Sequence, residues 1–492
     1  MTIPTIGWIA TLGSNRTKLA SYSIARYGPQ TGNDAQWMPD AGNGIRASDG
    51  TAITWNVPAD ANTPNTTTIQ RGWINHLVTR WGVAGNGGLR YYILDNEPAL
   101  WHETHRDVHP VGATMEEVRD LMVAYAREVK NADPGAQVVG PEEWGWLGTK
   151  LSGYDVQYGN ANGWPAWSSL PDRASHGQMD YLPWLLQQIQ QQSALDDRRL
   201  LDVFTSHYYP QGGEFGNDTS AAMQARRNKS TRSLWDPAYV DDSWIASVIR
   251  FIPQLRDWVN QYYPGTAIGI TEYNWGAEGH INGATAQADV YGIFGREGLD
   301  MAARWTTPAT TSPTYKAMKI YRNYDGNKST FGDVSVRTIS SSNPDSLAVF
   351  GAQRTADNAV TVMVVNKVSV STPVTVTLAS VAPEGTAQVY RLTSANTITR
   401  LADVALNGSS VTVTVPGQSV TLLVVGAGGG PANQPPTAVA AATPASGSAP
   451  LNVAFTAAGS LKASGVEGLP SSQQSMRRRL PSEVSRSHDP AR

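Results

Sequence analysis

The chain has 492 residues, a formal net charge of −3 at neutral pH and no cysteine. Its length allows one large barrel with one or two smaller domains, while its charge and the absence of a long basic stretch argue against nucleic acid as the main partner. The lack of cysteine excludes a disulfide framework and a cysteine nucleophile. No apolar run approaches the roughly 18–20 residues that span a membrane.

The first element predicted is a buried strand over residues 3–9, which follows directly on the N-terminus without a visible signal peptide. A polar stretch rich in Gly, Asn, Asp, Thr and Pro then continues to about Thr68. A stretch of this length is usually functional or lacks regular structure. We therefore assign no strand of the main sheet to this stretch.

From residue 69 a unit repeats, which consists of an amphipathic helix, a Gly or Pro break and a short apolar strand. The predicted helix and strand pairs are 69–82 with 91–94, 114–130 with 137–140, 178–192 with 200–206, 241–261 with 266–271, and 285–297 with 299–304. Such alternation is typical of a parallel sheet and, at this length, of a closed TIM-like (β/α)8 barrel. The fold class predicted for this part is therefore α/β.

The strand over residues 91–94 ends abruptly in Asp95-Asn96-Glu97-Pro98, because Pro98 cannot donate to a strand ladder. A carboxylate at the carboxyl end of a parallel strand is where barrel enzymes hold catalytic groups. A lone Asn-Glu-Pro also fits a strand that stops in a polar turn. The cluster over residues 101–109 favours a functional site, since it holds three of the eight histidines of the chain.

A second glutamate, Glu272, also ends a predicted apolar strand and is followed by aromatic residues. Because the carboxyl ends of parallel strands meet at one mouth of a barrel, Glu97 and Glu272 are expected to face each other. Two carboxyl groups that flank a bond are the minimum apparatus of glycoside hydrolysis, one as a general acid and the other as an ionised nucleophile or base. Abundant tryptophan and tyrosine (16 and 19 residues) add a weak sign of a sugar-binding cleft.

The remainder of the chain is β-rich and alternates with a period of two from about Tyr315, which predicts an antiparallel sandwich. The predicted organisation is a catalytic barrel (1–312), a β-sandwich (313–425), a Gly/Pro linker (426–435), the start of a PKD-like β-module (436–460) and a disordered tail (461–492). The tail gains Ser and Arg and loses apolar periodicity, so it also fits a shifted reading frame or a cloning artefact.

Five strand-end motifs, DNEPALWHETHRDVHP, GPEEWGW, SHYYPQ, ITEYNWG and ARWTTP, occur in this order. Together they resemble glycoside hydrolase family 44, a family of endoglucanases and xyloglucanases, over roughly residues 1–425. The resemblance implies a retaining mechanism on internal β-1,4-glucan bonds. Glu97 matches the acid/base and Glu272 matches the nucleophile, and retention implies carboxyl groups about 5–5.5 Å apart.

The resemblance also implies residues that bind the substrate, namely Asn96, Trp101, Trp144, His207, Tyr209, Tyr273, Trp275 and Trp305. Each of the tryptophans is equally well explained as a core residue. His207 and Tyr209 are equally well explained by a packing role, or they could orient Glu272. No cofactor is expected for the chemistry. Because family members can bind calcium, the resemblance allows a structural calcium with Glu103 and Asp155 as ligands. Taken singly, each of these residues is better explained as an ordinary surface residue. His102, His105 and His109 do not form a convincing zinc set.

In this barrel class the acid/base ends the fourth strand and the nucleophile the seventh. Only one strand is predicted before the strand that precedes Glu97, so the resemblance implies that the first two barrel strands and a secretion signal are missing. The expected protein is a secreted monomer that acts on β-1,4-glucan, without nucleic acid or membrane as partners. The alternatives are xylanase activity, an inactive chain that still binds glucan, and a β-rich adhesion protein, against which the helix–strand repeats count.

Overall fold

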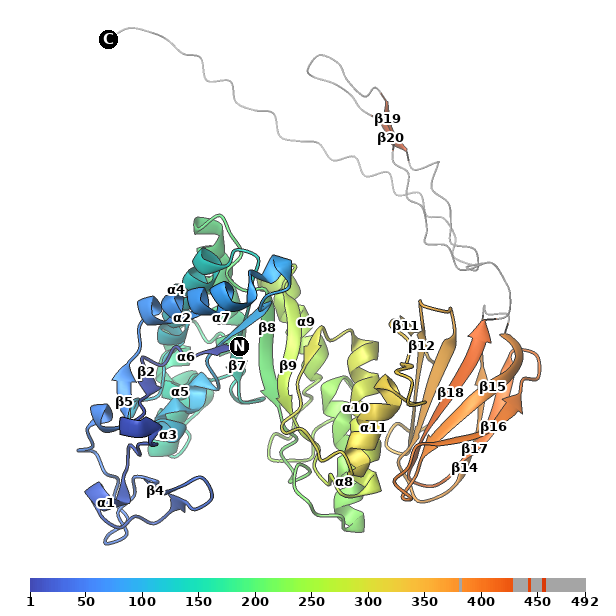
Figure 1. The fold of residues 1–492 in the computed structure, drawn as a ribbon, viewed down its shortest axis with the longest axis horizontal. Helices are drawn as coiled ribbons and strands as arrows, with labels where there is room; N and C mark the ends of the chain where they lie inside the picture. Colours follow the sequence, from blue (N-terminus) through green and yellow to red (C-terminus); the bar gives the residue numbers. More distant parts are fainter. Residues whose placement is uncertain (380–382, 428–440, 444–453, 457–492) are drawn as a thin grey trace.

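The fold was analysed in a computed structural model of the chain, which describes residues 1–379, 383–427, 441–443 and 454–456. A parallel six-stranded sheet and its flanking helices form the first part, and an antiparallel β-sandwich forms the second (Figure 1). This arrangement confirms the predicted fold class. No helix in the described ranges is both long and apolar enough to cross a membrane.

The parallel sheet has the strand order β1-β6-β7-β8-β9-β10, so its strands are neighbours in the order in which they occur in the chain. Its strands are β1 (Thr2–Ile3), β6 (Tyr91–Leu94), β7 (Gln137–Glu143), β8 (Val203–Tyr208), β9 (Ala267–Tyr273) and β10 (Met301–Ala302). All pairings between them are parallel. Among the described residues the sheet thus has two strands fewer than a closed eight-stranded barrel, and β1 and β10 are its edges.

Helices follow each strand and pack on the sheet. They are α2 (Thr67–Trp81), α3 (Trp101–Thr104), α4 (Met115–Ala132), α5 (Gly153–Ala161), α6 (Pro171–Ser175), α7 (Tyr181–Leu195), α8 (Ala221–Ser230), α9 (Phe251–Tyr262), α10 (Ile281–Glu297) and α11 (Pro313–Arg322). The start of α4 agrees with its sequence, because the hydroxyl of Thr114 accepts a hydrogen bond from the amide of Glu117 at the N-terminus of the helix. Its apolar face, which includes Val118, Met122 and Val129, lies in the main core.

The predicted single strand over residues 3–9 is wrong, because residues 4–7 belong to no strand and separate β1 from the next strand. Only Ile3 and its neighbour join the main sheet, and Gly7 has a φ of +90°. The following residues form a separate segment with β2 (Trp8–Ala10), α1 (Ile24–Tyr27), β3 (Asn33–Asp34), β4 (Met38–Gly42) and β5 (Asn62–Pro64). β2 pairs with β5 and β3 with β4, so the polar stretch holds short hairpins rather than a structureless loop.

The segment of residues 8–64 is fastened to the loop after α3. The guanidinium group of Arg106 donates to the carbonyls of Asn43 (3.0 Å) and Gly44 (2.8 Å). The amide of Asn62 donates to the carboxylate of Asp107 (3.1 Å). These bonds explain why the predicted 101–109 cluster carries so many polar groups, since part of it anchors this segment.

Two further predictions about helices are wrong. The helix predicted to start at Asp241 starts at Phe251, because Asp241 instead accepts hydrogen bonds within a turn, from the amide of Ser243 (2.9 Å) and the hydroxyl of Ser233 (2.8 Å). The β-pattern expected from about Tyr315 also begins later, since residues 313–322 form helix α11, which packs on α10.

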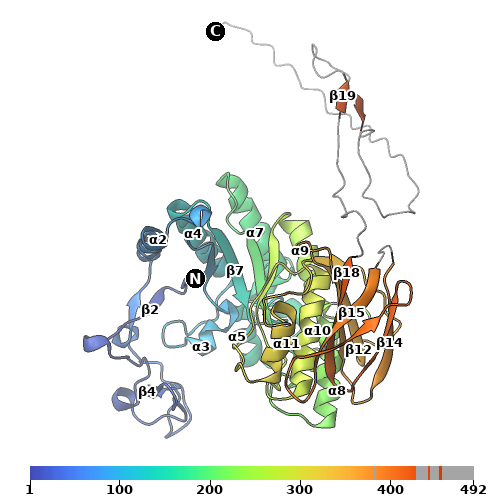
Figure 2. The same cartoon turned by 45° about the vertical axis from the view of Figure 1, so that its right-hand side comes forward.

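The sandwich has one six-stranded sheet, in the order β11-β12-β13-β18-β15-β16, and a two-stranded sheet of β14 and β17. The strands are β11 (Val334–Val336), β12 (Leu347–Gln353), β13 (Val360–Asn366), β14 (Thr372–Thr377), β15 (Pro383–Leu392), β16 (Thr399–Ala405), β17 (Ser410–Val415) and β18 (Ser419–Ala427). Figures 1 and 2 show α10 and α11 between the parallel sheet and this sandwich.

Beyond the sandwich, the structure describes only a short antiparallel pair, β19 (Ala441–Thr443) with β20 (Ala454–Thr456). Most of the predicted linker, most of the predicted PKD-like module and the whole predicted disordered tail lie outside the described residues. Those three statements stay predictions.

Candidate active site

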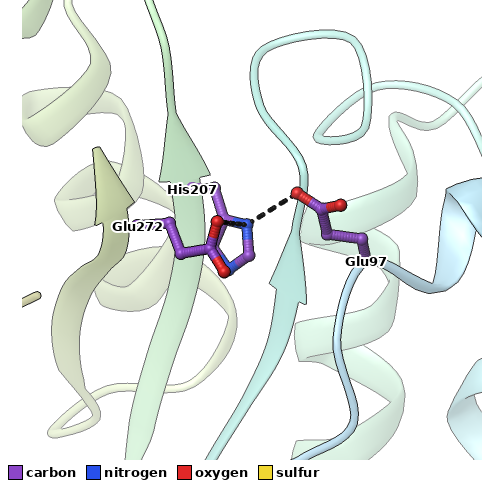
Figure 3. Close-up of side chains that lie close together, drawn as sticks. All are labelled: Glu97, His207 and Glu272. Carbon is purple, nitrogen blue, oxygen red and sulfur yellow. Dashed lines mark hydrogen bonds and ion pairs between the residues drawn. The ribbon is translucent and has the colours of Figure 1, made fainter. Parts of the chain in front are cut away.

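The carboxyl ends of β6, β8 and β9 bring Glu97, His207 and Glu272 together (Figure 3). One oxygen of each glutamate and a ring nitrogen of the histidine all lie within 4.8 Å of one another. The two glutamates come from strands that are three positions apart in the sheet. They are 175 residues apart in the sequence, so only the parallel sheet makes them neighbours.

Glu97 lies in a tight turn between β6 and a single helical turn over Pro98–Leu100. Its φ is +47°, a left-handed conformation that a residue other than glycine adopts only when its surroundings hold it there. The amide of Glu97 donates to the carbonyl of Glu142 on the neighbouring strand (2.9 Å). The backbone therefore fixes the Glu97 side chain towards β8, with about one fifth of it exposed (21%).

His207 is fully buried, and both of its ring nitrogens face carboxylates. Nδ1 lies 2.8 Å from Oε1 of Glu97 and 3.6 Å from Oε2 of Glu272. Nε2 lies 3.3 Å from Oε2 of Glu142. Burial lowers the pKa of His207, but the hydrogen bonds to Glu142 and Glu97 outweigh this effect and raise the pKa to about 9.

Glu272 has a second partner, because the hydroxyl of Tyr209 donates to its Oε2 (3.0 Å). Partial burial raises the pKa of Glu272, whereas His207 and the Tyr209 hydroxyl lower it. Both of these neighbours stabilise an ionised carboxylate. Burial is the larger effect, so the pKa of Glu272 lies above its usual value, and about one fifth of the side chain is exposed (20%).

Two further glutamates lie behind this cluster on β7, where the register with β8 shifts between Pro141 and Glu143. Glu142 accepts from the hydroxyl of Thr205 and lies against His207. Glu143 is fully buried, and neither of its oxygens has a hydrogen-bond partner. Burial raises the pKa of Glu143 to about 8, an effect that the nearby Tyr181 hydroxyl reduces, so this carboxyl is neutral at pH 7.

Three of the aromatic residues predicted to bind the substrate belong to the core. Trp101, Tyr273 and Trp275 are at most 3% exposed. The indole of Trp101 donates to the carbonyl of Asn96 (3.0 Å), and that of Trp275 donates to the hydroxyl of Ser230 (3.0 Å). Because all three side chains are covered by the rest of the protein, they support the walls of the site, and the predicted contact with substrate does not fit their burial.

Other residues predicted to bind the substrate are at least partly exposed or contact the glutamates. Trp305 is 57% exposed, and its carbonyl accepts from Asn274, which follows the strand of Glu272 (2.7 Å). Asn96 is exposed beside Glu97, and Trp144 is partly buried after β7. His207 and Tyr209 both contact Glu272, as one of their predicted roles required.

The sequence reading missed an aromatic group formed by Trp146, Trp167 and Trp244. The ring of Trp146 lies 5.9 Å from that of Trp244 and 6.2 Å from that of Trp167. Trp244 is 56% exposed, and its indole donates to Gln211 (3.3 Å), whose amide in turn donates to the carbonyl of Tyr209 (2.9 Å). Trp244 lies where a helix was predicted, so no strand-end pattern pointed to it.

The two predicted calcium ligands, Glu103 and Asp155, have other neighbours in the structure. Both carboxylate oxygens of Asp155 accept backbone amides, those of Asp172 (2.9 Å) and Arg173 (2.8 Å). Glu103 is largely exposed and lies next to His102. Among the described residues, potential metal ligands cluster in two places, Glu97 with His207 and Glu272, and Glu116 with Asp172 and His176. Neither cluster includes Glu103 or Asp155, and the calcium stays a prediction.

Known proteins are similar to this chain in sequence and in fold. The sequence model of glycoside hydrolase family 44 matches residues 1–212. Endoglucanase A of Paenibacillus lautus is 38% identical over 305 residues, which make up 60% of this chain. The chain spans 42% of the length of that relative.

Two solved structures extend the comparison to the sandwich. CelM2, a bifunctional glucanase-xylanase from a metagenome library, is 62% identical with a TM-score of 0.84, and the match covers 87% of this chain and 82% of that one. Cel44A, a family 44 endoglucanase from Clostridium thermocellum, is 30% identical with a TM-score of 0.64, over 72% of this chain and 70% of that one.

Proposed function

The chain belongs to glycoside hydrolase family 44, and from that premise we propose that it hydrolyses internal β-1,4 bonds of a glucan with retention of configuration. Glu272 is the nucleophile and Glu97 the acid/base. The substrate is a cellulose-type glucan or xyloglucan. The reaction needs no cofactor, because the two carboxyl groups supply the acid, the base and the nucleophile.

The observation that carries this proposal is the separation of the two glutamates. An oxygen of Glu97 lies within 4.8 Å of an oxygen of Glu272. Retaining glycosidases hold their carboxyl groups about 5–5.5 Å apart, whereas inverting enzymes need about 6.5–9.5 Å to admit a water molecule between carboxylate and sugar. The short separation therefore favours direct attack by a carboxylate.

In the first displacement, an oxygen of Glu272 attacks the anomeric carbon while Glu97 gives its proton to the departing glycosidic oxygen. The bond from the anomeric carbon to that oxygen breaks, and a glycosyl ester forms on Glu272. The hydroxyl of Tyr209 donates to the attacking carboxylate and stabilises its ionised state until the bond forms. As the ester forms, the negative charge on Glu272 is lost and a new negative charge remains on Glu97.

In the second displacement, Glu97 takes a proton from a water molecule that attacks the same anomeric carbon. The ester bond to Glu272 breaks, and the sugar leaves with its original configuration. Glu97 ends with the proton it had at the start. His207 lies between both carboxylates, so it offsets their negative charge whenever its ring is protonated.

Substrate contacts are expected on the exposed rings beside the glutamates. Trp305 and Trp244 present more than half of their surface to solvent, and flat aromatic faces stack on the apolar faces of glucose rings. A second candidate function is xylan hydrolysis. It is favoured by the 62% identity to a protein described as a bifunctional glucanase-xylanase.

The proposed setting of this activity is outside the cell, where β-1,4-glucan polymers occur. We propose that the protein acts there as a monomer, with the polysaccharide as its partner. The net charge of −3 supports the absence of a nucleic-acid partner. A membrane partner is not part of the proposal.

The test incubates the purified chain with carboxymethylcellulose, xyloglucan and xylan, and follows reducing ends and product size. The expected result is release of short oligosaccharides from both glucans, with the β-anomer formed first when a cello-oligosaccharide reaction is followed by proton NMR. A variant with both Glu97→Gln and Glu272→Gln is the matched control. Release of the α-anomer first, or equal activity of the control, would contradict the proposal, and binding without turnover would favour an inactive glucan-binding chain.

A further inference from the structure

The imidazole of His207 has a carboxylate on each side, although a neutral imidazole carries one N–H donor and one acceptor. Nδ1 faces Glu97 at 2.8 Å and Nε2 faces Glu142 at 3.3 Å. The nitrogen that carries the hydrogen in the neutral ring is decided by the partner of each nitrogen. The partner of Nε2, on the buried side of the ring, therefore decides whether Nδ1 can accept a proton from Glu97.

Glu142 is that partner on the buried side. Its side chain is 4% exposed, and its Oε1 accepts from the hydroxyl of Thr205. Its Oε2 is left for Nε2 of His207. An ionised carboxylate accepts hydrogen bonds and cannot donate them, so the hydrogen lies on Nε2 whenever the ring is neutral.

The backbone of β7 is distorted where it presents this side chain. The register between β7 and β8 shifts between Pro141 and Glu143, and Glu142 has a φ of +63°. Bulges of this kind turn a side chain out of the strand alternation and occur next to active sites. A strained conformation at a residue other than glycine persists only where the surrounding structure holds it. The distortion places Glu142 against His207, which the regular alternation of β7 does not provide.

We propose that Glu142 is a positioning residue for the reaction assigned above: its carboxylate holds the Nε2 hydrogen of His207, so that Nδ1 shares one exchangeable proton with Glu97. This inference rests on the proposed function, because it assigns a role within the same reaction. In the free enzyme this proton lies on Nδ1 when Glu97 is ionised and on Oε1 when Glu97 is ready to act as the acid.

The protons balance over one reaction cycle. In the first displacement the shared proton passes from Glu97 to the leaving oxygen, and in the second the attacking water returns one to Glu97. The Nε2 hydrogen stays on the ring throughout. Because Glu97 and Nδ1 are 2.8 Å apart, the proton can move between them without a rearrangement of side chains.

Glu142 also affects how tightly the pair of Glu97 and His207 holds this proton. The titratable groups around the ring are Glu97, Glu142, Glu143, Glu272 and Tyr209. Glu142 contributes a negative charge at hydrogen-bond distance from Nε2, which favours the protonated pair. Loss of this charge lets the pair release its proton at lower pH.

The experiment measures the pH profile of kcat/KM on a cello-oligosaccharide for the wild-type chain, Glu142→Gln and Glu142→Asp. We expect the alkaline limb of Glu142→Gln to move to lower pH by about one unit, while Glu142→Asp, which keeps the charge, stays nearer to the wild type. The matched control is Glu214→Gln. Glu214 is equally buried, but its carboxylate accepts from the amide of Gly212 (2.7 Å), so its variant should keep the wild-type limb.

A direct readout does not depend on activity. The ¹⁵N chemical shifts of His207 should show hydrogen on Nε2 across the titration of the wild-type chain and a change at Nδ1 alone. Hydrogen on Nδ1 with a bare Nε2 in the neutral ring, or an alkaline limb that Glu142→Gln leaves in place, would overturn the inference. A wild-type chain without glycosidase activity would instead overturn the proposed function, and the two failures are thus distinguishable.

Discussion

Glu97 and Glu272 share one neighbour, the buried imidazole of His207, but differ in the rest of their surroundings. Glu272 also accepts a hydrogen bond from Tyr209, which favours its ionised form. Glu97 is held by a strained turn, and its side chain contacts His207, with which it can exchange a proton. The environments therefore assign the nucleophile and the acid/base to different residues, as the mechanism requires.

The first prediction concerns Glu97→Ala. A substrate with a good leaving group needs no protonation in the first displacement. We expect the variant to lose much less activity on an activated aryl glycoside than on glucan, where the loss should be on the order of 100-fold or more. Added azide should raise the rate on the aryl substrate, since a small anion replaces the water that needs a base, and the product should be a β-glycosyl azide. Equal losses on both substrates without azide rescue would argue against the role.

A second prediction follows from the buried Glu143. Its pKa lies near its ordinary value of 4.5 in the unfolded chain and is raised to about 8 in the folded one. Between these values the folded state keeps a proton that the unfolded state has released. The free energy of unfolding must therefore fall with rising pH, by about 1.4 kcal/mol per unit for this group.

Glu143→Gln removes this contribution. Urea unfolding at several pH values should show that the free energy of unfolding of the variant rises relative to that of the wild type as the pH increases from about 4.5 towards 8. Above that range the difference between the two should be constant. Glu297→Gln at the end of α10, whose carboxylate pairs with Arg296, is the control, because arginine does not titrate in this range. Parallel pH profiles for Glu143→Gln and the wild type would show that the carboxyl is already ionised in the folded chain.

At the scale of elements, the sequence predicted the strands of the sheet better than the connections between them. β6, β7, β8 and β9 occur where short apolar runs end in polar residues, and α4 starts at its predicted cap. The strand over residues 3–9 and the helix from Asp241 were wrong, because the hydrogen bonds that break them involve partners distant in the chain or within a turn. The spacing of apolar residues along the chain does not reveal those hydrogen bonds.

The same limit applies to the site. Strand ends located Glu97, His207 and Glu272, because a parallel sheet places all carboxyl ends at one edge. The aromatic residues could not be sorted from sequence, since buried and exposed rings follow strands alike. Trp275 lies in the core, whereas Trp305 lies at the surface. Glu142 was quoted in a motif, but its role depends on a shift of register that no sequence pattern predicts.

The third prediction tests the exposed rings. Trp244→Ala and Trp305→Ala should each raise KM for cello-oligosaccharides about tenfold, equivalent to about 1.4 kcal/mol of lost stacking, with a smaller change in kcat. Trp81→Ala is the control, because Trp81 is similarly exposed (52%) but ends α2, which leads to the opposite end of the sheet. Unchanged KM values for Trp244→Ala and Trp305→Ala would exclude these rings from the substrate site.

At the scale of the whole molecule, the parallel sheet and the sandwich share a core. One face of the six-stranded sandwich sheet, which includes Met363 and Val365 of β13, packs in the same cluster as α10 and α11. The other face, with Val362 and Val364, packs on β14 and β17. Both faces of β13 are thus buried, which explains why its sequence is a continuous apolar run.

A buried ion pair crosses this interface. Lys367, directly after β13, pairs with Asp289 of α10, and both side chains are at most 2% exposed. The ammonium group also donates to the carbonyl of Asn228 (3.0 Å), and Asp289 accepts from the hydroxyl of Thr231 (2.7 Å). The pair therefore joins the two parts of the molecule, while its further partners belong to the first part, and breaking the pair leaves a buried charge.

The fourth prediction is that Lys367→Met lowers the free energy of unfolding by about 3–5 kcal/mol, whereas Lys367→Met combined with Asp289→Asn recovers part of the loss. Arg250→Met, which removes an exposed pair with Asp257, should cost less than about 1 kcal/mol. Tryptophan fluorescence, dominated by the first part of the chain, and far-UV circular dichroism should give coincident urea transitions for the wild type. Separate transitions would mean that the two parts fold independently and that the shared core contributes little.

The measurement that tests the central claim most directly is the capture of the glycosyl ester. A 2-deoxy-2-fluoro cello-oligosaccharide with a good leaving group slows both displacements, but its leaving group still allows the first, so the ester accumulates. Mass spectrometry of the digested protein should then show the added sugar on the peptide that contains Glu272, and no label in Glu272→Gln. Label on another residue, or turnover of this chain with no ester and an inverted product, would contradict the account.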